Sequence, residues 1–88
     1  MSLEDIKLEY IKWVDSRSSD DWTEVDRIEP TCIVCETVGW VVKENSDVLV
    51  VSGTRCLEIQ QVCLLMYIPR IAVTQRSRPV PSRFLGAE

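Results

Sequence analysis

The stretch from Thr31 to Gln75 consists of short apolar runs, rich in Val, Ile and Thr, that are separated by polar turns. β-Branched and aromatic residues favour pleated, half-buried strands. We therefore predict strands over 31–43, 48–54, 59–68 and 71–76. The polar run Lys43-Glu44-Asn45-Ser46-Asp47 is the expected turn between the first two strands, and Pro69-Arg70 breaks the chain before the last one.

Two details of these strands indicate a bent sheet with an apolar surface. Gly39 lies inside the first strand, where a glycine often marks a bulge or a sharp bend. Both faces of the third strand are mainly apolar, since side chains of a strand alternate between its two faces. The expected inner face consists of Val62, Leu64, Met66 and Ile68, and the expected outer face consists of Gln61, Cys63, Leu65 and Tyr67. Leu65 and Tyr67 either pack under a helix or line a contact between subunits.

The first 30 residues have a different pattern. Leu3, Ile6, Tyr10, Trp13 and Val14 recur at helical spacing behind Ser2, a good N-cap residue, so we predict a helix over 2–16. Residues 17–30 then form a polar connector, which we expect Trp22 to attach to the core and Pro30 to close. Pro79 and Pro81 predict an extended, mobile, basic tail over 77–88.

The chain has 88 residues, which predicts a single domain over 1–76 followed by that tail. The expected fold class is mainly β: an N-terminal helix followed by a small, strongly bent barrel of four to five antiparallel strands over 31–76. A barrel would remove the exposed edges of such apolar strands. A chain this short buries only roughly 60% of its unfolded surface, so a partner of the same kind would stabilise it.

Charge is distributed unevenly along the chain. Residues 1–50 carry twelve acids and five bases, whereas residues 51–88 carry two acids and five bases. The basic tail is therefore the candidate for phosphate contacts, with a plainly solvated tail as the alternative. No apolar run approaches the ~18 residues of a membrane helix, and the N-terminus lacks the features of a signal or transit peptide, so we expect a cytoplasmic protein without membrane contact.

The sequence offers little for catalysis. It contains no histidine, which excludes Ser-His-Asp and Cys-His catalysis within the chain. Its three glycines, Gly39, Gly53 and Gly86, do not form a phosphate-binding loop. We therefore expect a protein that is not an enzyme, has no cofactor and has no small-molecule substrate.

The cysteines Cys32, Cys35, Cys56 and Cys63 could be zinc ligands, a redox pair, structural disulfides or buried free thiols. Four thiolates can hold zinc tetrahedrally. However, Cys32 and Cys35 are separated by two β-branched residues, and residues three apart in a strand point to opposite faces. Buried free thiols acting as small apolar side chains are the favoured interpretation.

Two segments resemble those of Sm-like (LSm) proteins, whose barrels are related in shape to SH3-like ones. The segment TVGWVVKENSDVLVV (37–51) is similar to the family's second and third strands, and VCLLMYIPRIAV (62–73) is similar to its last two strands. The chain as a whole also resembles short, uncharacterised proteins encoded by phages and prophages, which carry a similar Cys-x-Thr-Val-Gly-Trp segment and a Cys…Ile-Pro-Arg segment.

The resemblance implies a bent five-stranded barrel, a ring of identical subunits in the cytoplasm of a bacterial host, and RNA contact at the turns. Asn45, Asp47 and Arg70 are the positions that match the family's base-binding turns. The family usually has a glycine after the basic residue of its last turn, whereas Ile71 follows Arg70 here. The alternative is that all three are ordinary turn residues.

Three hypotheses for the function follow. The leading one is a non-catalytic assembly module, a homo-oligomeric ring whose expected interface comprises Cys63, Leu65, Tyr67, Ile71 and Val73. The second is a nucleic-acid-binding module whose expected contacts are Asn45, Asp47, Arg70, Arg76, Arg78 and Arg83, with arginines facing phosphates. The third is a zinc-stabilised interaction module that uses Cys32, Cys35, Cys56 and Cys63.

Overall fold

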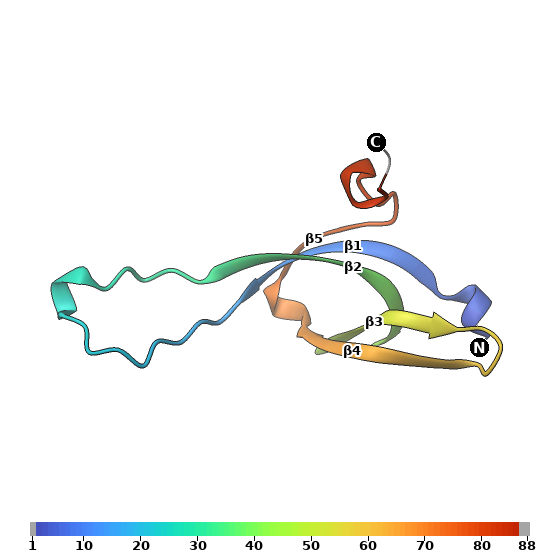
Figure 1. Ribbon diagram of the computed structural model, residues 1–88, viewed down its shortest axis with the longest axis horizontal. Helices are drawn as coiled ribbons and strands as arrows, with labels where there is room; N and C mark the ends of the chain where they lie inside the picture. Colours follow the sequence, from blue (N-terminus) through green and yellow to red (C-terminus); the bar gives the residue numbers. More distant parts are fainter. Residues whose placement is uncertain (1, 87–88) are drawn as a thin grey trace.

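The computed structural model describes residues 2–86, and these form one antiparallel sheet in the strand order β4-β3-β2-β1-β5 (Figure 1). The strands are β1 (Lys7–Asp15), β2 (Ile33–Glu44), β3 (Val48–Cys56), β4 (Gln61–Pro69) and β5 (Val73–Ser77). Four single 3₁₀ turns accompany them: η1 (Leu3–Asp5), η2 (Val25–Arg27), η3 (Arg70–Ala72) and η4 (Ser82–Phe84). No helix in this part of the chain is long and apolar enough to cross a membrane.

The mainly-β prediction is confirmed, and each strand expected after Thr31 is present with bounds shifted by a few residues. The turn at Asn45–Asp47 and the break at Arg70 are also where the pattern indicated. The expected closed barrel is not seen. The sheet is open, with β4 and β5 at its two edges.

The predicted helix over 2–16 is wrong, because this segment contains the short turn η1 and the interior strand β1, which lies between β2 and β5. It pairs with β2 from Lys7↔Val41 to Asp15↔Ile33, and on its other side with β5. Three consecutive residues, Glu9, Tyr10 and Ile11, are buried, so both faces of the strand are covered. A strand of this kind loses the polar–apolar alternation that identifies a half-exposed strand. Ser2 does cap a turn, but the turn is the short η1.

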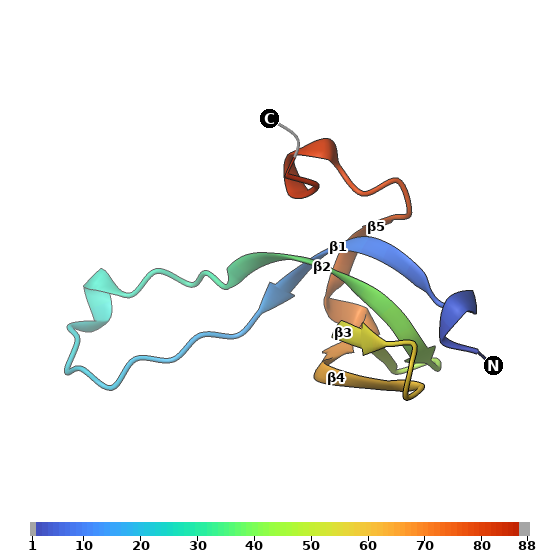
Figure 2. The ribbon, with the colours of Figure 1, turned by 45° about the vertical axis from the view of Figure 1, so that its right-hand side comes forward.

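The sheet bends so that the β3–β4 hairpin lies beneath β1 and β2 (Figures 1 and 2). Gly39 permits the close approach: a Cβ at this position would lie 2.5 Å from Cγ1 of Val51 and 2.7 Å from the carbonyl oxygen of Ser52. A shift in the β2–β3 register between Val41 and Lys43 increases the local twist. The core enclosed by the bend consists of Ile11, Leu49, Val51 and Ile68.

Residues 16–32, which we call the arm, connect β1 to β2 and project away from the sheet (Figures 1 and 2). The arm helps to extend the molecule to 53 Å along its longest axis. The side chain of Trp22 is 104% exposed, so the expectation that it attaches the connector to the core is wrong.

After β5 the chain turns back toward the sheet (Figure 1). The ring of Phe84 lies 5.5 Å from the ring of Tyr10, and Arg83 pairs with Glu36 of β2. This contact covers the face of β1 that points away from the core. The last two residues of the predicted tail lie outside the described residues.

Candidate functional site

Glu9 is the centre of a charged network that joins β1 to the C-terminal segment. Its carboxylate is 3% exposed and accepts two hydrogen bonds from Arg76, at 2.9 Å from Nε and 3.0 Å from Nη2. Arg78 donates a further bond at 3.3 Å. Arg76 also donates to Glu44 of β2, which in turn pairs with Arg70 of η3. The network therefore ties β1, β2, η3 and β5 together.

The network shifts the proton affinity of its members in the directions expected for ion pairs. Hydrogen bonds to Glu9 and then to Glu44 raise the pKa of Arg76 above its ordinary value. The hydrogen bond from Arg76 lowers the pKa of Glu44, with a smaller contribution from Arg70. Both groups stay charged at neutral pH, so the network acts as a structural clamp rather than as an acid–base pair.

A second polar cluster attaches the C-terminal segment to the outer face of β1. The hydroxyl of Tyr10 donates to Glu36 over 2.6 Å, and Nη2 of Arg83 donates to the same carboxylate oxygen over 2.6 Å. The hydrogen bond to Glu36 raises the pKa of Tyr10, and the same bond lowers the pKa of Glu36. The guanidinium of Arg83 also lies 4.5 Å from the ring centre of Phe84.

The turn residues that match the Sm-like base-binding positions do lie together. The backbone N–H of Arg70 donates to the carbonyl of Asp47 over 2.9 Å. The side-chain oxygen of Asn45 accepts from the backbone N–H groups of Asp47 and Val48, each at 2.8 Å. Asn45 thus stabilises its own turn in the way that Asn commonly does.

The four arginines expected to contact phosphates all have carboxylate partners. Arg70 pairs with Glu44, Arg76 with Glu9 and Glu44, Arg78 with Glu9, and Arg83 with Glu36. A phosphate would have to compete with these carboxylates, and the neighbouring negative charge lowers the local potential. The four arginines lie along one segment of the chain, but each of them already forms an ion pair with a carboxylate of the same chain.

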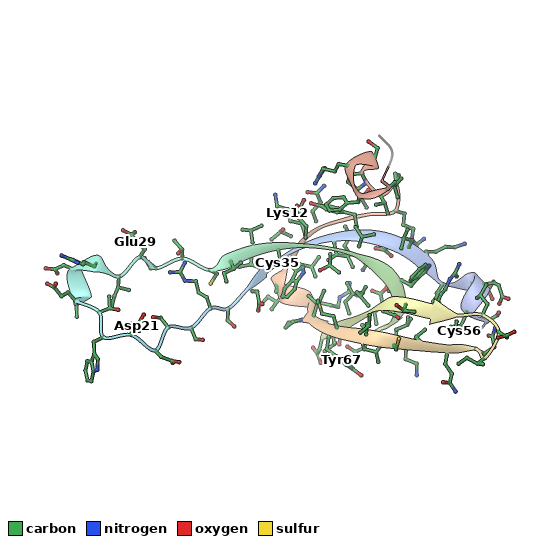
Figure 3. All side chains as sticks on the ribbon, in the orientation of Figure 1. Lys12, Asp21, Glu29, Cys35, Cys56 and Tyr67 are labelled. Carbon is green, nitrogen blue, oxygen red and sulfur yellow. The ribbon has the colours of Figure 1, made fainter. Side chains whose placement is uncertain are left out.

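The cysteines are not gathered into one group. Cys32, Cys56 and Cys63 are exposed and Cys35 is half-buried, so the expectation of buried thiols is wrong for this chain. Figure 3 shows Cys35 and Cys56 on different parts of the sheet. Within residues 2–86 no three His, Cys, Asp or Glu side chains come close enough to hold a metal ion.

Strand β4 presents the clearest surface feature of the sheet. Its neighbour on one side is β3, and no other strand of the described chain pairs with its outer edge. Large apolar side chains along it are exposed to solvent: Leu64 73%, Leu65 44%, Met66 41% and Tyr67 67%. Figure 3 shows Tyr67 pointing away from the sheet. Of the expected inner stripe, Ile68 alone is fully buried.

The expected interface residues are distributed over both edges of the sheet. Cys63, Leu65 and Tyr67 pair with Thr54, Ser52 and Val50, and therefore share the outer face of β4. Ile71 lies in η3 and is 97% exposed, whereas Val73 begins β5 and packs against the core. The outer face of β4, defined by Cys63, Leu65 and Tyr67, is the apolar patch that these residues form.

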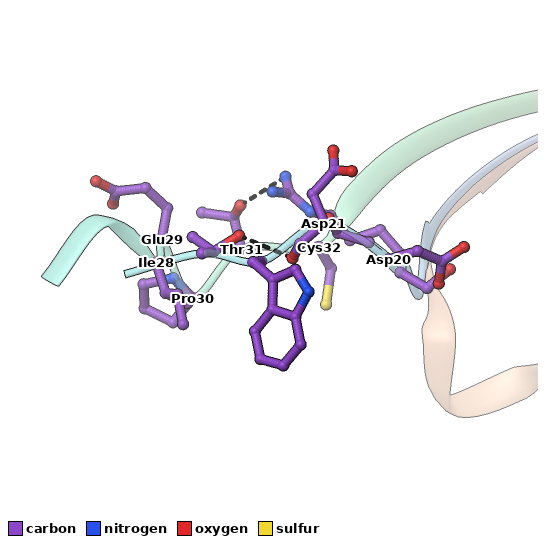
Figure 4. Close-up of a pocket in the computed structure, with 12 residues that line it drawn as sticks. Asp20, Asp21, Ile28, Glu29, Pro30, Thr31 and Cys32 are labelled. Carbon is purple, nitrogen blue, oxygen red and sulfur yellow. Dashed lines mark hydrogen bonds between the residues drawn. The ribbon is translucent and has the colours of Figure 1, made fainter. Parts of the chain in front are cut away.

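Several hollows lie on the described part of the chain, and two of them are considered as candidate sites. One of 490 Å³ lies between η1 and the end of β2 and is lined by Asp5, Ile6, Lys7, Val41, Val42, Lys43, Glu44 and Arg78. The other, of 750 Å³, lies between the two limbs of the arm (Figure 4). Its lining includes Trp22, Ile28 and Cys32, and neither hollow combines an activated nucleophile with a general base.

Comparisons with protein-family models, with curated proteins and with solved structures found no match to this chain. The functional argument therefore depends on the geometry of the chain itself.

Sequence reasoning missed two sets of residues that the structure makes prominent. Glu9, Glu36 and Glu44 hold the arginines, and the pattern gave no sign of this because their partners lie up to 69 residues away. Trp22, Val25 and Ile28 are exposed on the arm. Large apolar residues in an otherwise polar connector were the available signal for an interaction surface.

Proposed function

We propose that this chain is a non-catalytic assembly module that associates with copies of itself through the edges of its sheet. The observation that carries the proposal is the free edge of β4, which is lined by exposed Leu64, Leu65, Met66 and Tyr67. A long, apolar, unpaired edge strand is a ready template for pairing with another chain. The outer face of β4 adds an apolar patch beside that edge.

The surface of the single chain supports the need for a partner. Its accessible area is 6910 Å², whereas a compact monomer of 10.1 kDa exposes roughly 5,300 Å². The excess of about 1,600 Å² equals about two contributions of ~800 Å², the share that each partner gives to an interface of standard size. Two such contacts per subunit are what a head-to-tail assembly requires.

The topology supports a head-to-tail arrangement over a face-to-face dimer. Within residues 2–86 the unpaired edges belong to two different strands, β4 and β5, on opposite sides of the sheet. Pairing β4 of one copy with β5 of the next leaves a free β5 and a free β4 at the two ends, and this pattern continues until the assembly closes as a ring. An Sm-like ring, as the resemblance to phage-encoded and Sm-like proteins implies, is the finer form of the proposal.

Native mass spectrometry of the purified full-length protein at micromolar concentration tests it. We expect a single multiple of the 10.1 kDa subunit. Leu65→Glu places a charge on the β4 patch and should shift the protein to monomers. Ile59→Glu is the matched control, because Ile59 is 58% exposed but lies in the turn before β4. A wild-type protein that stays monomeric would contradict the proposal.

The nucleic-acid hypothesis predicts salt-sensitive binding that weakens when Arg76, Arg78 or Arg83 is replaced. The carboxylate partners of these arginines make it the weaker proposal. The same mass spectra would reveal nucleic acid or metal that stays with the purified protein.

A further inference from the structure

We infer that a turned peptide between Cys63 and Leu64 acts as a register stop, which limits the edge that β4 offers to a neighbouring copy to the segment Leu65–Pro69. This inference rests on the proposed self-assembly and names the part of the β4 edge that pairs. The other part of the strand, residues 61–64, stays unpaired on its outer side in the assembly.

The pairing of β4 with β3 determines which backbone groups point to the free edge of the sheet (Figure 1). The N–H of Arg70 donates to the carbonyl of Asp47 over 2.9 Å, so the pair Val48↔Pro69 that this bond encloses does not exchange hydrogen bonds of its own. Such pairs recur at every second residue of an antiparallel ladder, and their N–H and C=O groups point away from the partner strand. In a regular β4 the groups that point to the free edge would therefore belong to Cys63, Leu65 and Tyr67.

At Cys63 the chain departs from this regular pattern. The hydroxyl of Ser52 on β3 donates a hydrogen bond of 2.8 Å to the carbonyl oxygen of Cys63, so this carbonyl is turned toward β3. Because a trans peptide is planar, the N–H of Leu64 in the same peptide points the opposite way. Within the described strands the β3–β4 ladder accordingly omits the pair that Gly53 and Leu64 would form.

The turned peptide requires an unusual backbone conformation. Leu64 has a φ of +58°, in the left-handed region that residues with a side chain seldom adopt. Gln60 also has a positive φ, but it lies in the turn before β4, where this conformation is common. Ser52 is buried, and its oxygen also accepts from the N–H of Thr54 over 3.2 Å, which fixes the hydroxyl in place. Strain that the surroundings maintain in this way often marks a functional position.

An interruption of the edge is useful because the side chains of β4 do not fix how a neighbour pairs with it. Sliding a partner strand by two residues keeps every side chain on its own face, and both faces of β4 are mainly apolar. A regular edge of nine residues would therefore accept the five-residue β5 in more than one register. Beyond Leu64, the five residues Leu65–Pro69 remain, and they equal β5 in length. A single register gives every contact the same geometry, which a closed assembly of one size requires.

Amide hydrogen exchange at single-residue resolution tests the inference on the full-length protein. The N–H groups of Tyr67 and Cys63 are matched reporters, because both occupy edge-facing positions of β4. We expect the N–H of Tyr67 to exchange about tenfold or more slowly in the assembled wild type than in the Leu65→Glu monomer, because pairing removes it from water. The N–H of Cys63 should exchange at similar rates in both proteins.

Two replacements of Leu64 separate the turned peptide from the leucine side chain. Leu64 is 73% exposed, so neither replacement should disturb the core. Valine is β-branched and resists a positive φ, so Leu64→Val should restore a regular strand. The N–H of Cys63 should then also become protected, and native mass spectrometry should show more than one assembly size. Glycine adopts a positive φ freely, so Leu64→Gly is the matched control and should keep the exchange pattern and single size of the wild type.

The outcomes separate this inference from the proposed function. If the wild-type protein is monomeric, the proposed self-assembly fails, and the register stop fails with it. If it assembles but the N–H of Cys63 is slowed as strongly as that of Tyr67, or that of Tyr67 is not slowed, the register stop is overturned while self-assembly stands. A Leu64→Val variant with the exchange pattern and assembly size of the wild type would also overturn it.

Discussion

Gly39 determines where the sheet can bend, because the backbone of β3 occupies the space that a side chain would need. Replacing Gly39 with Ala forces a Cβ to within 2.5 Å of Val51 and 2.7 Å of Ser52. The backbone of Ser52 cannot move without disturbing the β3–β4 ladder. We expect Gly39→Ala to lower the free energy of unfolding by about 1–3 kcal/mol, measured by urea denaturation.

Gly53→Ala provides the matched control in the neighbouring strand. A Cβ at Gly53 would approach the Cβ of Leu64 at 3.3 Å, a contact that small adjustments of an exposed edge strand can relieve. Its effect should be clearly smaller than that of Gly39→Ala. Equal effects would show that the close crossing of β2 and β3 does not depend on Gly39.

Single residues also show what the sequence could reveal. A glycine inside a strand was enough to predict a bend at Gly39, and the structure supports this prediction. The exposure of Cys56 and Cys63 could not be inferred in the same way, since a cysteine in an apolar run looks like a core residue. These cysteines are exposed because β4 and the end of β3 extend beyond the small core.

At the scale of elements, β1 shows why the N-terminal prediction was wrong. The apolar residues from Leu3 to Val14 fit a helical stripe, yet β-branched and aromatic side chains among them also favour a strand. Pairing with β2 and β5 on its two sides decides between the two, and such long-range pairing is absent from local periodicity. By contrast, the later strands were predicted correctly because turns bound each of them.

The network around Glu9 predicts a strong dependence of β5 docking on Arg76. Arg76→Leu leaves a carboxylate that is 3% exposed with the longer bond to Arg78 as its remaining pair. Breaking a buried pair costs about 3–5 kcal/mol, and the partial exposure of Arg76 reduces our expectation to about 2 kcal/mol. Urea denaturation would measure this, with Arg83→Leu, an exposed pair, expected to have a smaller effect.

A double replacement distinguishes lost pairing from lost packing at this position. Glu9→Leu combined with Arg76→Leu removes the unpaired charge, and hydrophobic replacement of a buried pair is often close to neutral. We expect the double variant to be more stable than Arg76→Leu alone. A double variant that is less stable would mean that the carboxylate of Glu9 contributes in some way other than this pair.

The attachment of the C-terminal segment predicts sensitivity to acid. Glu36 and Glu44 have pKa values below their ordinary value of 4.5, because Tyr10 donates to the first and Arg76 to the second. A lowered pKa in the folded state stabilises the fold above about pH 4.5, and this stability is lost as the pH falls. Glu36→Gln should therefore destabilise the protein at about pH 7, and this difference in stability should diminish as the pH falls below about 4.5.

Thermal unfolding across this pH range would measure the effect. Glu24→Gln is the control, because Glu24 forms an exposed pair with Arg27 on the arm. This control should follow the wild-type curve. If the thermal midpoints of the wild type and Glu36→Gln differed by the same amount at all pH values, the lowered pKa of Glu36 would not be the cause of the stabilisation.

At the scale of the whole molecule, the sequence predicted a small β protein whose apolar core is too small to make a single chain very stable. The structure shows the size of that core. The fully enclosed core contains four residues, and the radius of gyration is 16.3 Å, against roughly 12 Å for a compact chain of this length. The open sheet and the projecting arm could not be predicted, because composition does not reveal whether apolar surface is covered by the same chain or by another.

An assembly that covers this surface links folding to association, and this gives the last prediction. If the single subunit is only marginally stable, the thermal midpoint of unfolding should rise with protein concentration, because association stabilises the folded state by mass action. Differential scanning calorimetry over a hundredfold range of concentration would measure the rise. Leu65→Glu should abolish the concentration dependence and unfold at the midpoint that the wild type approaches on dilution, whereas Ile59→Glu should retain it. A wild-type midpoint that is independent of concentration would mean that the small core of Ile11, Leu49, Val51 and Ile68, with the charged clamps around it, stabilises the chain without a neighbour.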